Sequence, residues 1–159
     1  MAYQLFNCRD FSFLYMQEFR GLHQFTMSGS TLKKIPTEVI WPEKLHSVDF
    51  SYNERLEVIE SYAFSSALGL QNLYLIGSGD NLVVQTNGFH TKSKLAKNLH
   101  ISSADPSDAI ENLQLEPNAF GNVEGGELWT GLFVQTSDFP EDVFRLMLKT
   151  HFDKGHTSE

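Results

Sequence analysis

The clearest indication of the fold is a segment with regularly spaced apolar residues, Leu45-His46-Ser47-Val48-Asp49-Phe50-Ser51-Tyr52-Asn53, followed by Leu56 and Ile59. Its apolar residues stand at the first, fourth and sixth positions, and an asparagine stands at the ninth, close to the spacing L-x-x-L-x-L-x-x-N-x-L. Positions four and six point to one side of an extended segment, whereas positions five and seven point to the other. One such unit cannot bury its apolar face alone, so the pattern predicts a stack of similar units.

The same spacing recurs on both sides of this stretch. An upstream block contains Leu22, Phe25, Met27, Ser30, Leu32 and Ile35-Pro36. Three downstream blocks contain Leu70, Leu73, Leu75, Ser78 and Leu82; Ala96, Leu99, Ile101 and Ala104; and Trp129, Leu132, Val134, Ser137 and Phe139-Pro140. The block starts are 23, 25, 26 and 33 residues apart, and an insertion around Asp105 to Glu116 enlarges the last interval.

A second signal has the same period. A small or branched residue followed by phenylalanine closes the return segments, at Ala63-Phe64, Gly88-Phe89, Ala119-Phe120 and Val143-Phe144. These pairs predict a stacked column of rings on the convex side of the array. A generic strand-rich domain with coincidental leucines is the alternative, but two separate columns with one period are hard to obtain by chance.

The repeats divide the chain into three parts. Residues 22–144 form an array of about five repeats, and residues 1–21 and 145–159 flank it. In the first flank Phe11, Tyr15 and Phe19 are spaced for one face of a helix, which predicts an N-terminal cap. In the second, Phe144, Leu148 and Phe152 have the same spacing, which predicts a C-terminal cap or a truncated repeat with a tail.

Composition bounds the possible partners. The chain has 159 residues, of which 41% are hydrophobic and 20% charged, and a formal net charge of −8. These values fit one globular domain and disfavour nucleic acid or an anionic membrane surface as a partner, because both need clustered Lys and Arg. No apolar run approaches the ~20 residues that span a bilayer, and the start shows no export signal.

Cys8 is the only cysteine, so the chain has no internal disulfide and no thiolate-based zinc site. A lone cysteine suits a reducing compartment. It suits equally well a fragment in which Cys8 has lost its partner.

The units Leu22 to Val39 and Leu45 to Phe64 resemble the typical, extracellular class of leucine-rich repeats, through Ile35-Pro36, the segment Phe139-Pro140-Glu141-Asp142-Val143-Phe144 and the phenylalanine column. Two segments, Phe25-Thr26-Met27-Ser28-Gly29-Ser30 and Val48-Asp49-Phe50-Ser51-Tyr52-Asn53, are similar to secreted arthropod proteins of this class, such as the group related to a luciferase non-catalytic subunit. The resemblance implies an α/β solenoid, a horseshoe with a parallel β-sheet on the concave face and irregular or short helical return segments on the convex face. It also implies an extracellular location and a binding or scaffolding role without catalytic residues.

A search for catalytic or metal chemistry yields little. His23 and His46 occupy the second position of adjacent repeats and should lie about 4.8 Å apart on neighbouring strands. With no third ligand in that column, two solvent-facing imidazoles are favoured over a shared metal. No nucleophile, base and orienting group fall together. The sequence therefore predicts no enzyme, no cofactor and no metal site.

The strand positions that point away from the core should line the concave sheet. Their middle column contains Thr26, Asp49, Tyr74, His100 and Phe133, and the column beside it contains Ser28, Ser51, Ile76, Ser102 and Gln135, with Tyr52 in the next. Aromatic residues are preferred at interfaces, whereas a merely solvated face usually carries Lys, Glu and Ser. The predicted partner-binding residues are Asp49, Tyr52, Tyr74, Ile76, His100 and Phe133.

Two functions follow from this face. The first is a non-enzymatic protein-binding module or scaffold whose partner is an unidentified protein. The alternative is a pattern-recognition protein that binds glycans or other non-protein ligands on the same face, with Asp49, Asn72 and Asn98 as polar groups beside the aromatic rings.

Overall fold

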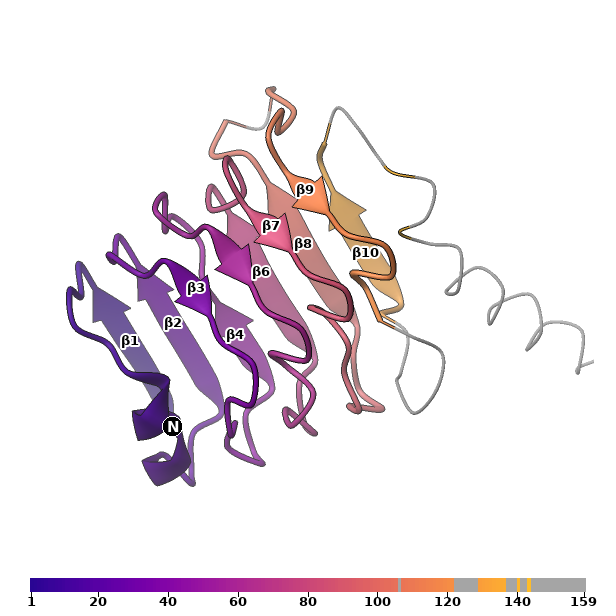
Figure 1. The fold of residues 1–159 in the computed structure, drawn as a ribbon. Coiled ribbons are helices and arrows are strands. Elements are labelled where there is room, and N and C mark those ends of the chain that lie inside the picture. Colours follow the sequence, from indigo (N-terminus) through magenta and orange to yellow (C-terminus); the bar gives the residue numbers. More distant parts are fainter. Residues whose placement is uncertain (106, 122–128, 137–139, 141–142, 144–159) are drawn as a thin grey trace, which may run out of the picture.

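The computed structural model describes residues 1–105, 107–121, 129–136, 140 and 143 of the chain. Their strands form two parallel sheets that face each other across a core (Figure 1). The six-stranded sheet consists, in spatial order, of β1 (Ala2–Phe6), β2 (Gln24–Ser28), β4 (Ser47–Asp49), β6 (Asn72–Ile76), β8 (Asn98–Ser102) and β10 (Gly131–Val134). The four-stranded sheet consists of β3 (Lys34–Ile35), β5 (Val58–Ile59), β7 (Val83–Val84) and β9 (Gln114–Leu115).

The chain alternates between the two sheets and forms a parallel β-solenoid of about four turns. Every strand pair is parallel, and equivalent repeat positions are paired, as in Val48 with Leu73 and Leu73 with Leu99. This arrangement confirms the predicted stacking of one repeat on the next. The register follows from the period of two along each strand, because a slip by one residue would turn the apolar side chains to solvent.

The first, fourth and sixth positions of the first four blocks are buried, as predicted. They are Leu22, Phe25, Met27, Leu45, Val48, Phe50, Leu70, Leu73, Leu75, Ala96, Leu99 and Ile101. In the fifth block Trp129 is buried, but Leu132 and Val134 are half-buried. These two belong to β10, which is paired on one side only among the described strands.

The predicted ring column is present. Phe64 and Phe89 stack with ring centres 6.4 Å apart, and Phe89 and Phe120 stack at 5.5 Å. Phe144, the fourth predicted member, lies outside the described residues. The column instead begins one coil earlier, with Trp41 stacked 5.4 Å from Phe64. The Trp41 indole also donates a hydrogen bond to the Ala63 carbonyl at 2.7 Å, which joins two coils.

The return segments differ from the expectation of irregular or short helical chain. They carry the two-residue strands of the four-stranded sheet, and the described residues contain no α-helix. Pairs such as Val58-Ile59 and Val83-Val84 explain the difference, because β-branched side chains favour extended backbone. Within the described part of the chain no helix is long and apolar enough to cross a membrane.

The N-terminal flank contributes both a strand and a short helix. Strand β1 pairs with β2 in the six-stranded sheet, and a 3-10 helix, η1 (Phe13–Glu18), follows it. The expected helical face of Phe11, Tyr15 and Phe19 is wrong for Tyr15, which is 54% exposed. A 3-10 helix repeats every three residues rather than every 3.6, so Met16 becomes the buried residue of this segment.

Candidate functional site

The six-stranded sheet has one face in the core and one face outward. Five of the outward residues were predicted as a column, and the strand register places them on directly adjacent strands. Strand β1 adds a sixth, because Gln4 pairs with Thr26. We name this set the outer row; its members are Gln4, Thr26, Asp49, Tyr74, His100 and Phe133.

His100 and Phe133 form the most prominent contact of the outer row. Their rings stack with centres 4.5 Å apart, and Phe133 is 53% exposed. The ring nitrogen Nε2 of His100 lies 3.0 Å from the Ser102 hydroxyl oxygen, which fixes the imidazole. Partial burial lowers the pKa of His100, so the neutral imidazole dominates at pH 7. The pair presents a flat aromatic surface.

Tyr74, Ile76 and Asp49 extend this surface across β6 and β4. Tyr74 and Ile76 are half-buried on the outward side of β6. A carboxylate oxygen of Asp49 accepts a hydrogen bond from the Ser51 backbone amide at 2.9 Å, and the Ser51 hydroxyl accepts one from the Ile76 amide at 3.1 Å. Asp49 is therefore held in one orientation and keeps oxygen lone pairs for a partner.

Tyr52 lies at the end of this surface rather than on a strand. It occupies the turn that follows β4, with φ of 60°, and its side chain is 54% exposed. Its ring covers Gly77 of the next coil, where a Cβ atom would lie 3.0 Å from the ring. Tyr52 thus adds an exposed aromatic side chain beside Ile76, with which it shares a backbone hydrogen bond of 2.7 Å.

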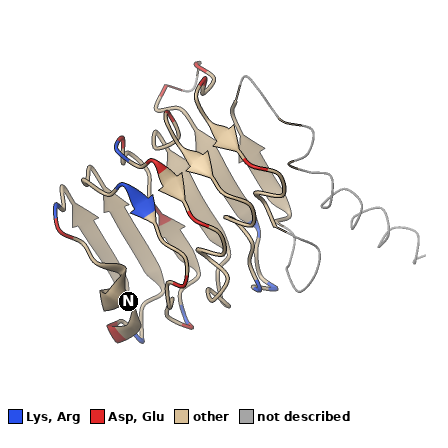
Figure 2. Cartoon of the chain, in the orientation of Figure 1, with Lys and Arg blue, Asp and Glu red and all other residues tan. Residues whose placement is uncertain are grey.

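The outer face carries little charge. Figure 2 shows the strands of the six-stranded sheet almost without basic or acidic colouring. Among the outward positions of its described strands, Asp49 is the one Asp, Glu, Lys or Arg. A further polar contact on this face joins the Asn98 side-chain amide, as donor, to the Asn72 amide oxygen at 2.7 Å. Such a face can be desolvated at lower cost than a lysine- and glutamate-rich one.

Strand β1 and its outward residues Gln4 and Phe6 were missed from the sequence. Tyr3 pairs with Phe25 and Leu5 with Met27, which are the fourth and sixth repeat positions shifted back by one coil. The same spacing at Tyr3 and Leu5 could have revealed the strand. Phe6 is exposed and lies beside Ser28.

The two histidines of adjacent repeats are neighbours, as predicted. The rings of His23 and His46 stack with centres 5.8 Å apart, and both remain at the surface. In the ranges that the structure describes, no three His, Cys, Asp or Glu side chains are grouped so that they could hold a metal ion.

A serine and histidine contact on the return side was not expected. The Ser65 hydroxyl oxygen lies 2.9 Å from Nδ1 of His90, and the imidazole packs edge-on against the Tyr62 ring. Burial, helped by the charge of Lys92, lowers the pKa of His90. The contact joins the coils of Ser65 and His90 and stabilises their stacking, since it gives the buried imidazole a hydrogen-bond partner.

The chain is thus a parallel β-solenoid whose outer face is aromatic and weakly charged. No protein-family model, no curated protein and no solved structure matches the chain.

Proposed function

We propose that this chain is a non-enzymatic protein-binding module or scaffold that acts through the outer row. The main support for this proposal is the aromatic surface that Tyr74, His100 and Phe133 form on adjacent strands. Since neighbouring strands are about 4.8 Å apart, the segment from Asp49 to Phe133 spans roughly 15 Å, the scale of a peptide or of part of a protein contact patch.

The chemistry of this surface favours a protein partner. Binding energy at protein interfaces concentrates in a few aromatic anchors surrounded by polar residues. Phe133 and Tyr74 supply the anchors, and Thr26, Asp49 and the amides of Asn72 and Asn98 supply polar groups around them. The low charge of the surrounding face fits the depletion of Lys and Glu from interface centres.

The same proposal includes the class of solenoid and the location of the protein. The repeat spacing, the buried leucine positions and the ring column support a solenoid of the leucine-rich-repeat class, with the outer row on the concave side. The resemblance to extracellular members of that class supports a secreted protein. The net charge of −8 supports a partner other than nucleic acid.

A glycan ligand is the second candidate, favoured by one observation. Asn72 and Asn98 lie two residues before Tyr74 and His100 on the same face of the sheet, so their paired amides flank the aromatic rings. Sugar rings stack on aromatic planes and exchange hydrogen bonds with such amides. A glycan array probed with the purified chain distinguishes this candidate from a protein partner.

The proposal is tested by comparing the proteins recovered on immobilised wild type and on a double variant, Tyr74→Ala with Phe133→Ala. We expect the double variant to stay folded and to lose the partner, with each substitution weakening binding by about 2 kcal/mol or more. Leu95→Ala is the matched control, because Leu95 is 50% exposed and lies outside the outer row. Equal recovery on wild type and double variant would contradict the proposal.

A further inference from the structure

The four-stranded sheet has an open edge at β3. Its strand order begins at β3, whereas the six-stranded sheet extends one strand further, to β1. The carbonyls of Lys33 and Ile35 accept hydrogen bonds from the Val58 and Glu60 amides of the next coil. Because backbone groups alternate in direction along a strand, the amide and carbonyl of Lys34 point to the open side. This edge can pair with one further strand.

A cavity of about 490 Å³ adjoins the open edge. Phe11 and Phe13 line it from the N-terminal flank, and Leu32, Val39 and Ile40 line it from the first return segment. Its volume lies within the ~300–1,000 Å³ typical of ligand pockets. Ile40 is exposed although it is large and apolar. The cavity is therefore large and apolar enough to accept an apolar side chain.

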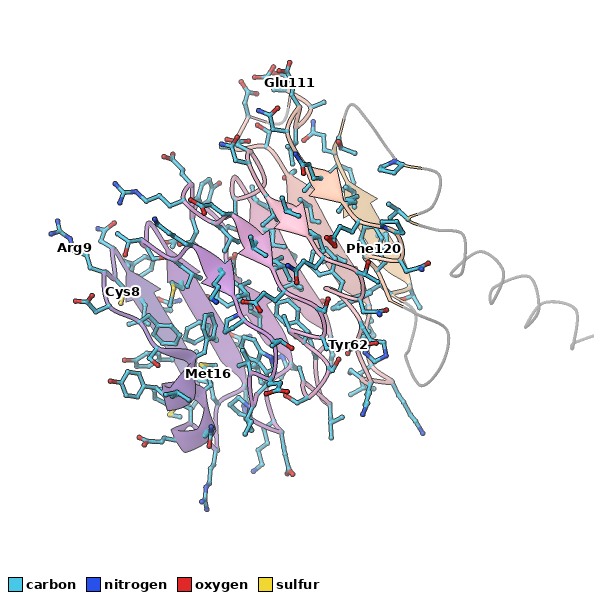
Figure 3. The ribbon with its side chains drawn as sticks, viewed as in Figure 1. Cys8, Arg9, Met16, Tyr62, Glu111 and Phe120 are labelled. Carbon is cyan, nitrogen blue, oxygen red and sulfur yellow. The ribbon has the colours of Figure 1, made fainter. Side chains whose placement is uncertain are left out.

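Positive charge gathers around this cavity in a chain whose net charge is −8. Arg9, Lys33 and Lys34 line it, against one acidic residue, Glu38. Lys34 is paired with Glu60 at 3.0 Å, but within the described ranges Arg9 and Lys33 have no carboxylate within salt-bridge distance. Figure 2 shows β3 as a blue strand, and Figure 3 shows Arg9 and Cys8 at the same end of the solenoid.

We infer that this end of the solenoid binds an extended peptide segment in which acidic residues flank an apolar one. The peptide backbone pairs with Lys34 at the open edge and adds a strand to the four-stranded sheet. Its apolar side chain enters the cavity beside Phe11 and Phe13. Because neighbouring residues of a strand point to opposite sides, the flanking carboxylates stay at the surface, where Arg9 and Lys33 attract them.

This peptide site is separate from the outer row, so it is tested independently of the proposed function. A phage-displayed library of random nine-residue peptides is panned against the full chain, and enriched peptides are synthesised with a fluorophore for anisotropy titrations. We expect enrichment of an apolar residue with acidic neighbours. The double variant Arg9→Glu, Lys33→Glu should bind at least about tenfold more weakly, and wild-type affinity should fall with added salt. The control variant Phe133→Ala should bind like wild type.

Hydrogen exchange locates the bound peptide. Saturating peptide should slow exchange of the Lys34 amide and leave the amides of β8 unchanged. Arg9 and Lys33 are exposed, so the charge-reversed variant should unfold at the wild-type denaturant midpoint. The decisive peptides are those that still bind the Phe133→Ala variant, which excludes binding to the outer row. The inference is overturned if no such peptide is enriched, if these peptides lack acidic residues, if the charge-reversed variant binds them within about twofold of wild type, or if Lys34 exchange does not change.

Discussion

Asn53 is the residue that most directly joins neighbouring coils. Its amide nitrogen donates to the carbonyls of Met27 and Phe50 at 2.8 and 2.7 Å, and its carbonyl oxygen accepts from the Ser30 amide and hydroxyl at 3.1 and 2.6 Å. The side chain is fully buried. Removal of the amide would take a hydrogen bond from each of these groups, although the Phe50 carbonyl would keep the one it accepts from the Ser78 hydroxyl at 2.6 Å.

Substitution of Asn53 should therefore destabilise the fold more than substitution of Ser30. We expect Asn53→Ala to lower the free energy of unfolding by about 1–3 kcal/mol, because several buried backbone groups each lose a hydrogen bond. Ser30→Ala should cost less, since its hydroxyl contacts only the Asn53 oxygen and the Leu32 amide. Urea titrations of both variants measure the difference. Equal and negligible effects would show that the turn does not depend on this amide.

His90 should make stability depend on pH. Burial lowers its pKa in the folded chain below the value of about 6.5 for an exposed histidine, so the unfolded chain binds more protons between the two values. The free energy of unfolding should be highest above pH 6.5 and fall as the pH drops towards the folded-state pKa. His90→Gln keeps a polar group beside Ser65 but cannot titrate. Urea titrations between pH 7.5 and 5.5 should give a smaller loss for this variant than for wild type, and identical losses would be evidence against the assignment.

Each strand of the six-stranded sheet has alternating side chains that form one buried face and one outward face. Leu73 is fully buried in β6, whereas Tyr74, the next residue, is half-buried on the outer face. This alternation could be predicted from Val48 and Phe50, which lie two residues apart, because apolar residues at a period of two indicate one buried face of an extended chain. The two-residue strands of the return segments could not, since a pair such as Val58-Ile59 is too short to show a period.

Adjacent substitutions in β6 test this alternation. Leu73→Ala should lower the free energy of unfolding by about 2–5 kcal/mol, because it leaves a cavity in a close-packed core. Tyr74→Ala should cost about 1 kcal/mol or less, since the outer face tolerates truncation. Phe89→Ala, in the ring column, should match Leu73→Ala. Similar losses for Leu73→Ala and Tyr74→Ala, measured by urea denaturation, would be inconsistent with two distinct faces.

At the scale of the whole molecule, the sequence predicts the middle of the solenoid better than its ends. The columns through Leu45, Leu70 and Phe64 repeat often enough to specify the stacking, and five of the six outer-row residues follow from it. The first coil is different, because only Tyr3 and Leu5 carry the pattern there. Its helix is a 3-10 helix with three residues per turn, whereas the spacing of Phe11, Tyr15 and Phe19 predicts an α-helix with 3.6.

The incomplete first coil leaves the solenoid with two surfaces of different chemistry. The outer row is aromatic and weakly charged, whereas the open edge at β3 is narrow, apolar and basic. A partner bound to one surface need not contact the other, because they lie on different sheets. The proposed function depends on the outer row alone, so a test of the peptide site neither supports nor contradicts it.

Photocrosslinking that locates the bound partner tests most directly whether the outer row is the binding surface. Benzoylphenylalanine, a photoreactive residue, is introduced in turn at Phe133, at Tyr62 in a return segment and at Ile40 at the cavity, and each chain is irradiated with the protein recovered by the wild type. All three native side chains are exposed, so each probe is accessible. We expect a covalent adduct from position 133 and none from positions 62 and 40. An adduct from position 62 or 40 without one from position 133 would contradict binding through the outer row.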